Sequence, residues 1–175
     1  VEHGAGVLAG FVGGGVAGVQ AALDLANTGY YVYVVDSSSA IGGVMAQLDK
    51  TFPTNDCSMC ILSPKLVEAG RHLNIQLITM AELVSLEGEK GRFVATVRER
   101  PRYVDMDKCI ACGLCAEKCP KRVADDYNVG VGKRKAIYIK YSQTVPLKYA
   151  IDKDACIFFL KGKCKACEKF CPTGA

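Results

Sequence analysis

The sequence predicts two successive folds. A partial α/β, Rossmann-like nucleotide-binding domain is expected over residues 1–100, and an α+β ferredoxin module carrying two [4Fe–4S] clusters over residues 101–175. Three observations predict them: a GxGxxG turn after a short apolar segment, eight of ten cysteines in two runs that each end in Cys-Pro, and a composition that is half hydrophobic with 18 glycines. Such a composition suits a glycine-rich α/β protein and not a disordered chain.

The first domain opens with an expected strand over Val7–Val12, which runs into the glycine-rich turn Gly13–Gly18. In a dinucleotide-binding unit the first glycine permits the tight turn. The second lets the backbone approach a pyrophosphate, and the third allows the following helix to pack closely on the strand. Gly13, Gly15 and Gly18 occupy these three places.

A helix and a second strand should follow the turn. Apolar residues recur at three-to-four spacing from Val16 to Ala26, and the segment 27–29 (Asn-Thr-Gly) supplies a C-terminal stop. The strand Tyr31–Val35 then ends at Asp36, where a carboxylate accepts hydrogen bonds from an adenosine ribose, while the helix N-terminus favours phosphate. A glycine-rich turn without a ligand is the plainer alternative.

The residues after Asp36 bear on the choice of nucleotide. Serines at 37–39 stand where an arginine would favour a 2′-phosphate, so NADP is disfavoured. The unit alone does not separate FAD from NAD, but the segment 41–43 (Ile-Gly-Gly) resembles the second glycine pair of two-dinucleotide-fold flavoproteins and favours FAD. The candidate cofactor-binding residues are Gly13, Gly14, Gly15, Val16, Ala17, Gly18, Asp36, Ser37, Gly42 and Gly43.

The middle of the chain carries an unpaired CxxC, Cys57 and Cys60. The two residues can be a redox disulfide near a flavin, half the ligands of a third cluster, or two buried thiols. His3 and His72 are interpreted as surface or packing residues.

A strand over Ile75–Met80 and a hairpin from Leu83 to Val97 are expected next. The charged run Arg98–Arg102 then reads as a solvated connector between the domains.

The strongest motif is Cys109-x2-Cys112-x2-Cys115-x3-Cys119-Pro120, followed by Cys156-x7-Cys164-x2-Cys167-x3-Cys171-Pro172. In two-cluster ferredoxins the first three cysteines of a run bind one cubane and the fourth binds the other. The predicted sets are therefore Cys109, Cys112, Cys115 and Cys171 for cluster 1, and Cys156, Cys164, Cys167 and Cys119 for cluster 2.

Zinc is the main alternative for these thiolates, but zinc sites usually come as two CxxC pairs with a long spacer. The second run opens with x7 instead of x2, so one loop must bulge by five residues. Gly113 and Gly174 give the backbone room near cluster sulfur, and alternation predicts a strand over Lys135–Tyr141.

Charge is uneven along the chain. Residues 1–107 hold 8 Lys/Arg against 12 Asp/Glu, whereas residues 108–175 hold 14 against 6. Negatively charged clusters balance part of this basic half, so nucleic acid is not expected as a partner. The uncharged stretch Gly4–Leu23 is long enough to span a membrane, but its glycines disfavour a span. Without a visible signal peptide we expect a reduced, cytoplasmic protein, and the missing initiator Met suggests a fragment of a longer chain.

Together these segments resemble the heterodisulfide reductase A-subunit family, including the homologous flavoprotein subunit of quinone-interacting membrane-bound oxidoreductase complexes. The resemblance covers nearly the whole chain. It depends on GGGVAG with Asp36, IGGVMAQLDKTFPTNDCSMCILSPKLVEA, CIACGLCAEKCP, GKRKAIYIKYSQTVPLKYAIDKDAC and GKCKACEKFCPTGA.

The resemblance implies a thioredoxin-reductase-like FAD domain interrupted by an inserted two-cluster ferredoxin domain. It implies an oxidoreductase subunit that passes electrons between FAD, the clusters and partner redox subunits, such as those of hydrogenases or dehydrogenases, with electron bifurcation in some members. The family also places cluster ligands outside its ferredoxin motifs, which adds weight to Cys57 and Cys60 as ligands. It continues beyond the position of Ala175 into the rest of the FAD domain. A non-catalytic electron carrier or cluster scaffold without tightly bound flavin is the alternative function.

Overall fold

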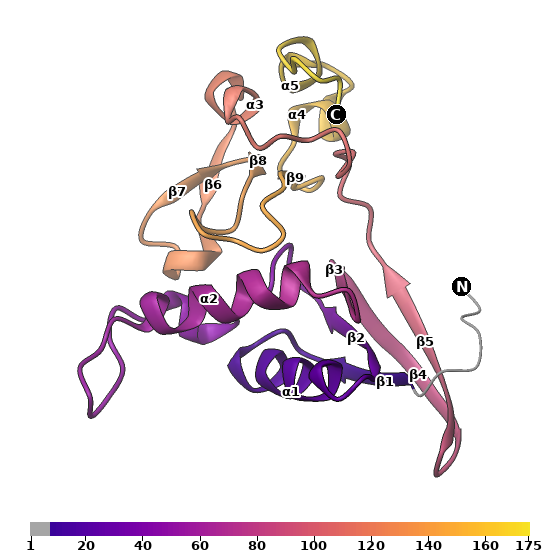
Figure 1. Cartoon of the computed structure of the whole chain (residues 1–175). Coiled ribbons are helices and arrows are strands. Elements are labelled where there is room, and N and C mark those ends of the chain that lie inside the picture. Colours follow the sequence, from indigo (N-terminus) through magenta and orange to yellow (C-terminus); the bar gives the residue numbers. More distant parts are fainter. Residues whose placement is uncertain (1–7) are drawn as a thin grey trace. The chain divides into compact units, whose positions relative to one another are not determined.

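The computed structural model describes residues 8–175. Contacts within the chain divide it into two compact units, and the division lies between Pro101 and Arg102 (Figure 1). The first unit is α/β, and the second is built of short helices and strands around the cysteine runs.

The first unit contains a parallel sheet of three strands in the order β1-β2-β3 (Figure 1). Its strands are β1 (Leu8–Val12), β2 (Tyr31–Asp36) and β3 (Ile75–Thr79), all three near their predicted places. Parallel neighbours require crossover connections, and here each crossover contains a helix.

Two helices pack against each other and against this sheet (Figure 1). They are α1 (Val16–Asn27), which confirms the predicted helix, and α2 (Ser58–Arg71), with the short helix η1 (Val44–Gln47) between β2 and α2. The core between helices and sheet is apolar: Val19, Leu23, Val32, Val34, Leu62 and Leu66 are all nearly inaccessible to solvent. No helix among residues 8–175 is long and apolar enough to cross a membrane.

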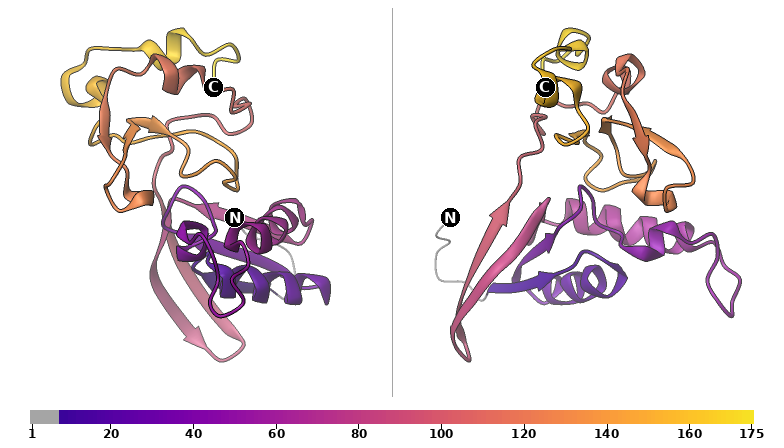
Figure 2. Two further views of the ribbon diagram at one scale, coloured as in Figure 1. Left: turned by 90° about the vertical axis from the view of Figure 1, so that its left-hand side faces the viewer. Right: turned by 180° about the vertical axis from the view of Figure 1, so that it is seen from behind.

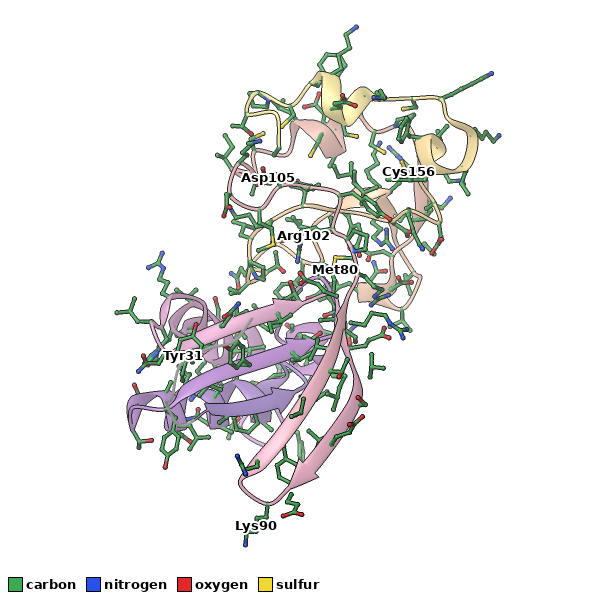
Figure 3. The ribbon with its side chains drawn as sticks, turned by 90° about the vertical axis from the view of Figure 1, so that its right-hand side faces the viewer. Tyr31, Met80, Lys90, Arg102, Asp105 and Cys156 are labelled. Atoms are coloured by element: carbon green, nitrogen blue, oxygen red, sulfur yellow. A yellow bond between two sulfur atoms is a disulfide. The ribbon has the colours of Figure 1, made fainter. Side chains whose placement is uncertain are left out.

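An antiparallel hairpin completes the first unit. It joins β4 (Ala81–Glu89) to β5 (Arg92–Glu99) through Lys90 and Gly91, with Lys90 at its tip (Figure 3), and it confirms the predicted hairpin.

The expected solvated connector at Arg98–Arg102 is wrong in detail. Arg100 donates to the carbonyl of Ser37 at 2.5 Å and pairs with Glu82 at 3.5 Å. Arg102 is only 8% exposed and donates to the carbonyl of Lys148 at 3.2 Å. Each of these two guanidinium groups links two segments of the chain, because its backbone acceptor lies far away in the sequence.

The second unit contains two small antiparallel sheets, three short α-helices and one 3-10 helix (Figure 2). Its elements are α3 (Leu114–Lys118), β6 (Arg122–Ala124), η2 (Asp126–Asn128), β7 (Lys133–Lys135), β8 (Ile137–Tyr138), β9 (Ala150–Ile151), α4 (Ile157–Lys161) and α5 (Ala166–Lys169).

The single strand predicted over Lys135–Tyr141 is therefore wrong. Two shorter strands, β7 and β8, meet near Ala136 and pair with different partners, β6 and β9. Ala136 donates its N–H to the carbonyl of Lys121 at 3.2 Å, and its own carbonyl accepts from the N–H of Asp152 at 2.8 Å. The chain changes sheets at this residue, which alternation of side chains alone does not reveal.

Candidate functional site

The glycine-rich turn joins β1 to the N-terminus of α1. Gly13 has a φ of +109°, a conformation that favours glycine, and its N–H donates to the carbonyl of Val35 at 2.7 Å. A Cβ atom on Gly18 would lie 2.1 Å from the carbonyl oxygen of Gly13, so a side chain there would strike backbone. The turn therefore requires glycine at both positions for steric reasons.

Asp36 holds this turn in place from the end of β2. Its Oδ2 accepts the N–H of Gly14 at 2.7 Å, and its Oδ1 accepts the N–H and the hydroxyl of Ser38 at 2.8 and 2.7 Å. Each carboxylate oxygen accepts about two hydrogen bonds, so Oδ2 retains room for one further donor such as a ribose hydroxyl. The sequence did not reveal the bond to Gly14, although Asp-x-Ser is a common local turn pattern.

A second glycine loop lies directly against the first. The N–H of Gly42 donates to the carbonyl of Gly14 at 2.6 Å, and a Cβ on Gly43 would lie 2.9 Å from the Cα of Gly15. Ile41 fills the space beside Gly14. The two loops thus converge at the first turn of α1, with Gly15 as an N-cap that supplies no side-chain hydrogen bond.

This arrangement fits a dinucleotide phosphate. Helix N-termini present backbone N–H groups and a partial positive charge, and an uncapped one satisfies them with an anion or water. Val16 and Ala17 are exposed at this end, so nothing in the described chain covers it.

The cysteine runs are organised by two short helices in the second unit. Cys115 lies on α3 and Cys167 on α5, and the two helices are in contact. Gly113 precedes α3 with a φ of +88°, and Gly174 follows the last cysteine with a φ of +63°. Both glycines thus adopt the left-handed conformation that lets the backbone turn tightly beside the thiols.

The eight cysteines line two adjoining cavities. The larger, of about 310 Å³, is lined by Cys109, Cys112, Cys115, Cys171, Cys156, Cys164 and Cys167. The smaller, of about 20 Å³, is lined by Cys119, Cys156, Cys164 and Cys167. Cys119 therefore lines the smaller cavity with the first three cysteines of the other run, whereas Cys171 lines the larger cavity with the first three cysteines of both runs.

Cys115 and Cys167 each have electrostatic neighbours among the thiols of both runs. Burial raises the pKa of the Cys115 thiol to about 11, and thiolates at Cys109, Cys112 and Cys167 add to the rise. Burial likewise raises the pKa of Cys167, with contributions from Cys156 and Cys119. Such thiols must lose their protons to bind iron, so metal binding here releases protons.

Two comparisons bear on these thiols. Residues 102–124 match the 4Fe-4S binding domain family. The chain is 51% identical over 164 residues to the iron-sulfur A-subunit of the CoB--CoM heterodisulfide reductase from Methanocaldococcus jannaschii, covering 94% of this chain and 24% of that protein. The chain belongs to the heterodisulfide reductase A-subunit family.

Other members are similarly close. The identity is 49% to the A-subunit of the H(2):CoB-CoM heterodisulfide,ferredoxin reductase from Methanothermobacter marburgensis, over 94% of this chain and 24% of that protein. It is 44% to the A-subunit of the Ferredoxin:CoB-CoM heterodisulfide reductase from Methanosarcina mazei, over 94% of this chain and 20% of that protein. The chain thus spans about a quarter of the length of these relatives.

Among solved structures, thioredoxin reductase from T. acidophilum aligns with a TM-score of 0.44 and 20% identity, covering 51% of this chain and 30% of that chain. This likeness is too weak to bear on function.

Two lysines support the cysteine runs in this member of the heterodisulfide reductase family. Lys148 donates its ammonium to the carbonyl of Cys109 at 2.7 Å, and Lys135 donates to the carbonyl of Cys119 at 2.5 Å. The sequence did not identify either lysine, because each lies 16 or more residues from its partner. Each places a fixed positive charge beside the backbone of a candidate cluster ligand.

We expect Lys148→Met to lower the reduction potential of the cluster bound by the Cys109 set. Removing a positive charge disfavours the extra electron, and at intermediate dielectric constant the shift is on the order of 50 mV. Potentiometric titration followed by EPR measures it. Lys133→Met, an exposed lysine on β7, is the matched control, and an equal shift in both variants would contradict a local effect of Lys148.

Within residues 8–175, no three His, Cys, Asp or Glu side chains converge closely enough to hold one metal ion.

Cys57 and Cys60 lie at the start of α2, in the other unit, and form a disulfide. Both residues are exposed, so the interpretation as buried thiols is wrong. Cys57 caps the helix, and its sulfur accepts the N–H of Cys60 at 3.2 Å. Among the described residues no third metal-binding side chain joins them. Of the other predicted residues, His72 packs near Asn27 and Asn74, and His3 lies outside the described part.

Proposed function

We propose that this chain passes single electrons between two [4Fe–4S] clusters and an FAD within a heterodisulfide-reductase-like oxidoreductase. The observation that carries the proposal is the grouping of eight thiols in two adjoining cavities. Cys109, Cys112, Cys115 and Cys171 hold cluster 1, and Cys156, Cys164, Cys167 and Cys119 hold cluster 2. The two cavities share Cys156, Cys164 and Cys167 in their linings, which supports direct exchange between the two clusters.

The FAD would bind at the two glycine loops, with its pyrophosphate at the N-terminus of α1 and its ribose at Asp36. Gly13, Gly15 and Gly43 keep side chains out of that space. When bound, the flavin links two-electron donors to one-electron clusters. The protein's part is to position the cofactor and to supply the N–H groups that neutralise its phosphates.

Partners follow from the relatives' names. One relative belongs to an H(2):CoB-CoM heterodisulfide,ferredoxin reductase, and another to a ferredoxin:CoB-CoM heterodisulfide reductase. By analogy we propose that this protein assembles with further redox subunits of the hydrogenase or dehydrogenase type. We also propose that its flavin divides electrons between two acceptors. A reducing cytoplasm suits its eight free thiols.

The proposal is tested with a protein that contains this chain and is as long as the relatives, purified anaerobically. The two cysteine runs should contribute about eight irons and eight sulfides, with about one flavin bound. Asp36→Ala should lose most of the flavin and keep the iron, because Asp36 shapes the glycine turn. Zinc or a single cluster in these runs would refute the cluster assignment, and clusters without flavin in the unmodified protein would favour the carrier alternative.

We also propose that Cys57 and Cys60 are a redox pair that takes up two electrons and two protons to become a dithiol. A cysteine at a helix N-terminus is stabilised as the thiolate, which suits thiol exchange. Iodoacetamide followed by mass spectrometry should leave both residues unmodified until a dithiol reductant is added. The competing interpretation, a third cluster, predicts about four additional irons in the full-length protein that disappear in Cys57→Ala.

A further inference from the structure

The second cysteine run differs from the first by five additional residues between its first two cysteines. The structure folds this insertion into α4, which ends at Gly162 with a φ of +66°, and the chain then reaches Cys164 with a φ of +81°. Cys164 is exposed, whereas its partners Cys156 and Cys167 are half-buried. Cys164, which follows the insertion, is thus an exposed candidate ligand of cluster 2, as Cys112 is of cluster 1.

Basic side chains flank this exposed cysteine along the chain. From Ile157 to Cys171 the chain carries four lysines and one acid, and all five charged side chains are exposed. The lysines are Lys161, Lys163, Lys165 and Lys169. The one acid, Glu168, pairs with Lys165 at 3.1 Å. A net positive charge thus remains around Cys164.

Apolar side chains lie beside the lysines. Phe158 and Phe159 stack edge to face with ring centroids 5.5 Å apart, and the ammonium of Lys165 lies 5.2 Å from the ring centre of Phe158. Phe158 is 36% exposed, Phe159 42% and Leu160 59%. Both phenylalanines line the larger cavity together with Cys164 and Lys165. An aromatic centre with a basic rim is the usual composition of a docking surface.

We propose that α4 and the loop to Cys167 form the docking surface for an acidic redox protein, and that the electron crosses at Cys164. This rests on the proposed function, since it needs cluster 2 on its predicted ligands. The exchange is one electron from the reduced cluster to a one-electron acceptor, with no bond made or broken and no proton moved. The lysines attract the acidic partner, and the phenylalanines pack against it.

Lysines and phenylalanines can also bind an anionic lipid surface. The exposure of Cys164 favours a redox protein, because only an electron acceptor gains from an exposed cluster ligand beside these lysines and phenylalanines. The short α4, five residues long, also offers little apolar area for insertion into a bilayer.

The experiment uses the chain reconstituted with iron and sulfide and then reduced photochemically. Its oxidation is followed by stopped flow with two high-potential acceptors, acidic plastocyanin and basic cytochrome c. We expect Lys161→Glu/Lys163→Glu to slow oxidation by plastocyanin about tenfold at low salt and to speed oxidation by cytochrome c. The difference should disappear at high salt.

The matched control is Lys90→Glu/Arg92→Glu, which makes the same change of net charge at the hairpin tip in the other unit (Figure 3). Equal effects of the two variants would overturn the docking surface. Sedimentation with phosphatidylglycerol vesicles that depends on Lys161 and Lys163, without any preference for plastocyanin, would overturn it in favour of a lipid surface.

Iron content and EPR spectra, recorded first, separate this inference from the proposed function. If the wild type lacks two cubanes, the proposed function fails. If both cubanes are present and the charge preference is absent, only the docking surface fails.

Discussion

Replacing Cys119 with alanine is expected to remove about four of the eight irons and to spare the cluster held by Cys109, Cys112 and Cys115. The reason is positional. Cys119 follows these three residues in sequence, yet it lines a cavity with Cys156, Cys164 and Cys167. Substitution of Cys119 should therefore remove the cluster bound by the distant cysteines and not the cluster bound by its neighbours in sequence.

Double variants distinguish the crossed arrangement from one in which each run holds its own cluster. If the ligands cross, Cys119→Ala/Cys164→Ala loses one cluster and retains about four irons, because both residues serve cluster 2. Cys119→Ala/Cys112→Ala then loses both clusters. An uncrossed arrangement predicts the opposite for each pair.

Cys171 supplies the reciprocal control. It lines the larger cavity with the first three cysteines of both runs, and its sulfur accepts the N–H of Ala175 at 3.3 Å. Cys171→Ala combined with Cys112→Ala should retain about four irons, measured by colorimetric iron assay and EPR spin quantitation. Loss of all iron from that pair would contradict the assignment even if the Cys119 variants behaved as expected.

Local spacing predicted much of this chain. The strands β1 and β2, the helix α1, the hairpin and the two cysteine runs all follow from patterns within about ten to twenty residues, where periodicity is informative. Asp36 could also be identified from the sequence, because it directly follows the apolar residues that predict β2.

Features decided by distant partners were missed. Arg102 is buried because Lys148 offers it a carbonyl, and Ala136 divides an apparent strand because Lys121 and Asp152 take its two backbone groups. Lys148 was missed for the same reason, since it reaches Cys109 across 39 residues. None of these pairings leaves a local pattern, so each required the folded chain.

The third glycine of the nucleotide-binding turn provides the largest effect expected in the first unit. We expect Gly18→Ala to destabilise this unit by about 1–3 kcal/mol, as backbone-directed overpacking does. A Cβ there would lie 2.1 Å from the carbonyl oxygen of Gly13, and neither backbone segment can move without disturbing β1 or α1. On helix propensity alone, alanine would instead stabilise α1 by about 1 kcal/mol. The sign of the change therefore separates steric packing from propensity.

Gly10→Ala is the matched control, since a Cβ on Gly10 of β1 would meet no heavy atom within 4 Å. Hydrogen exchange with mass spectrometry on peptides covering β1, α1 and β2 should show lost protection in Gly18→Ala and unchanged protection in Gly10→Ala. Equal protection in both would mean that the turn can open to admit a side chain. In that case the close approach of Gly18 to Gly13 would not hold the N-terminus of α1 at the end of β1. The phosphate site would then depend on the hydrogen bond between Asp36 and Gly14 alone.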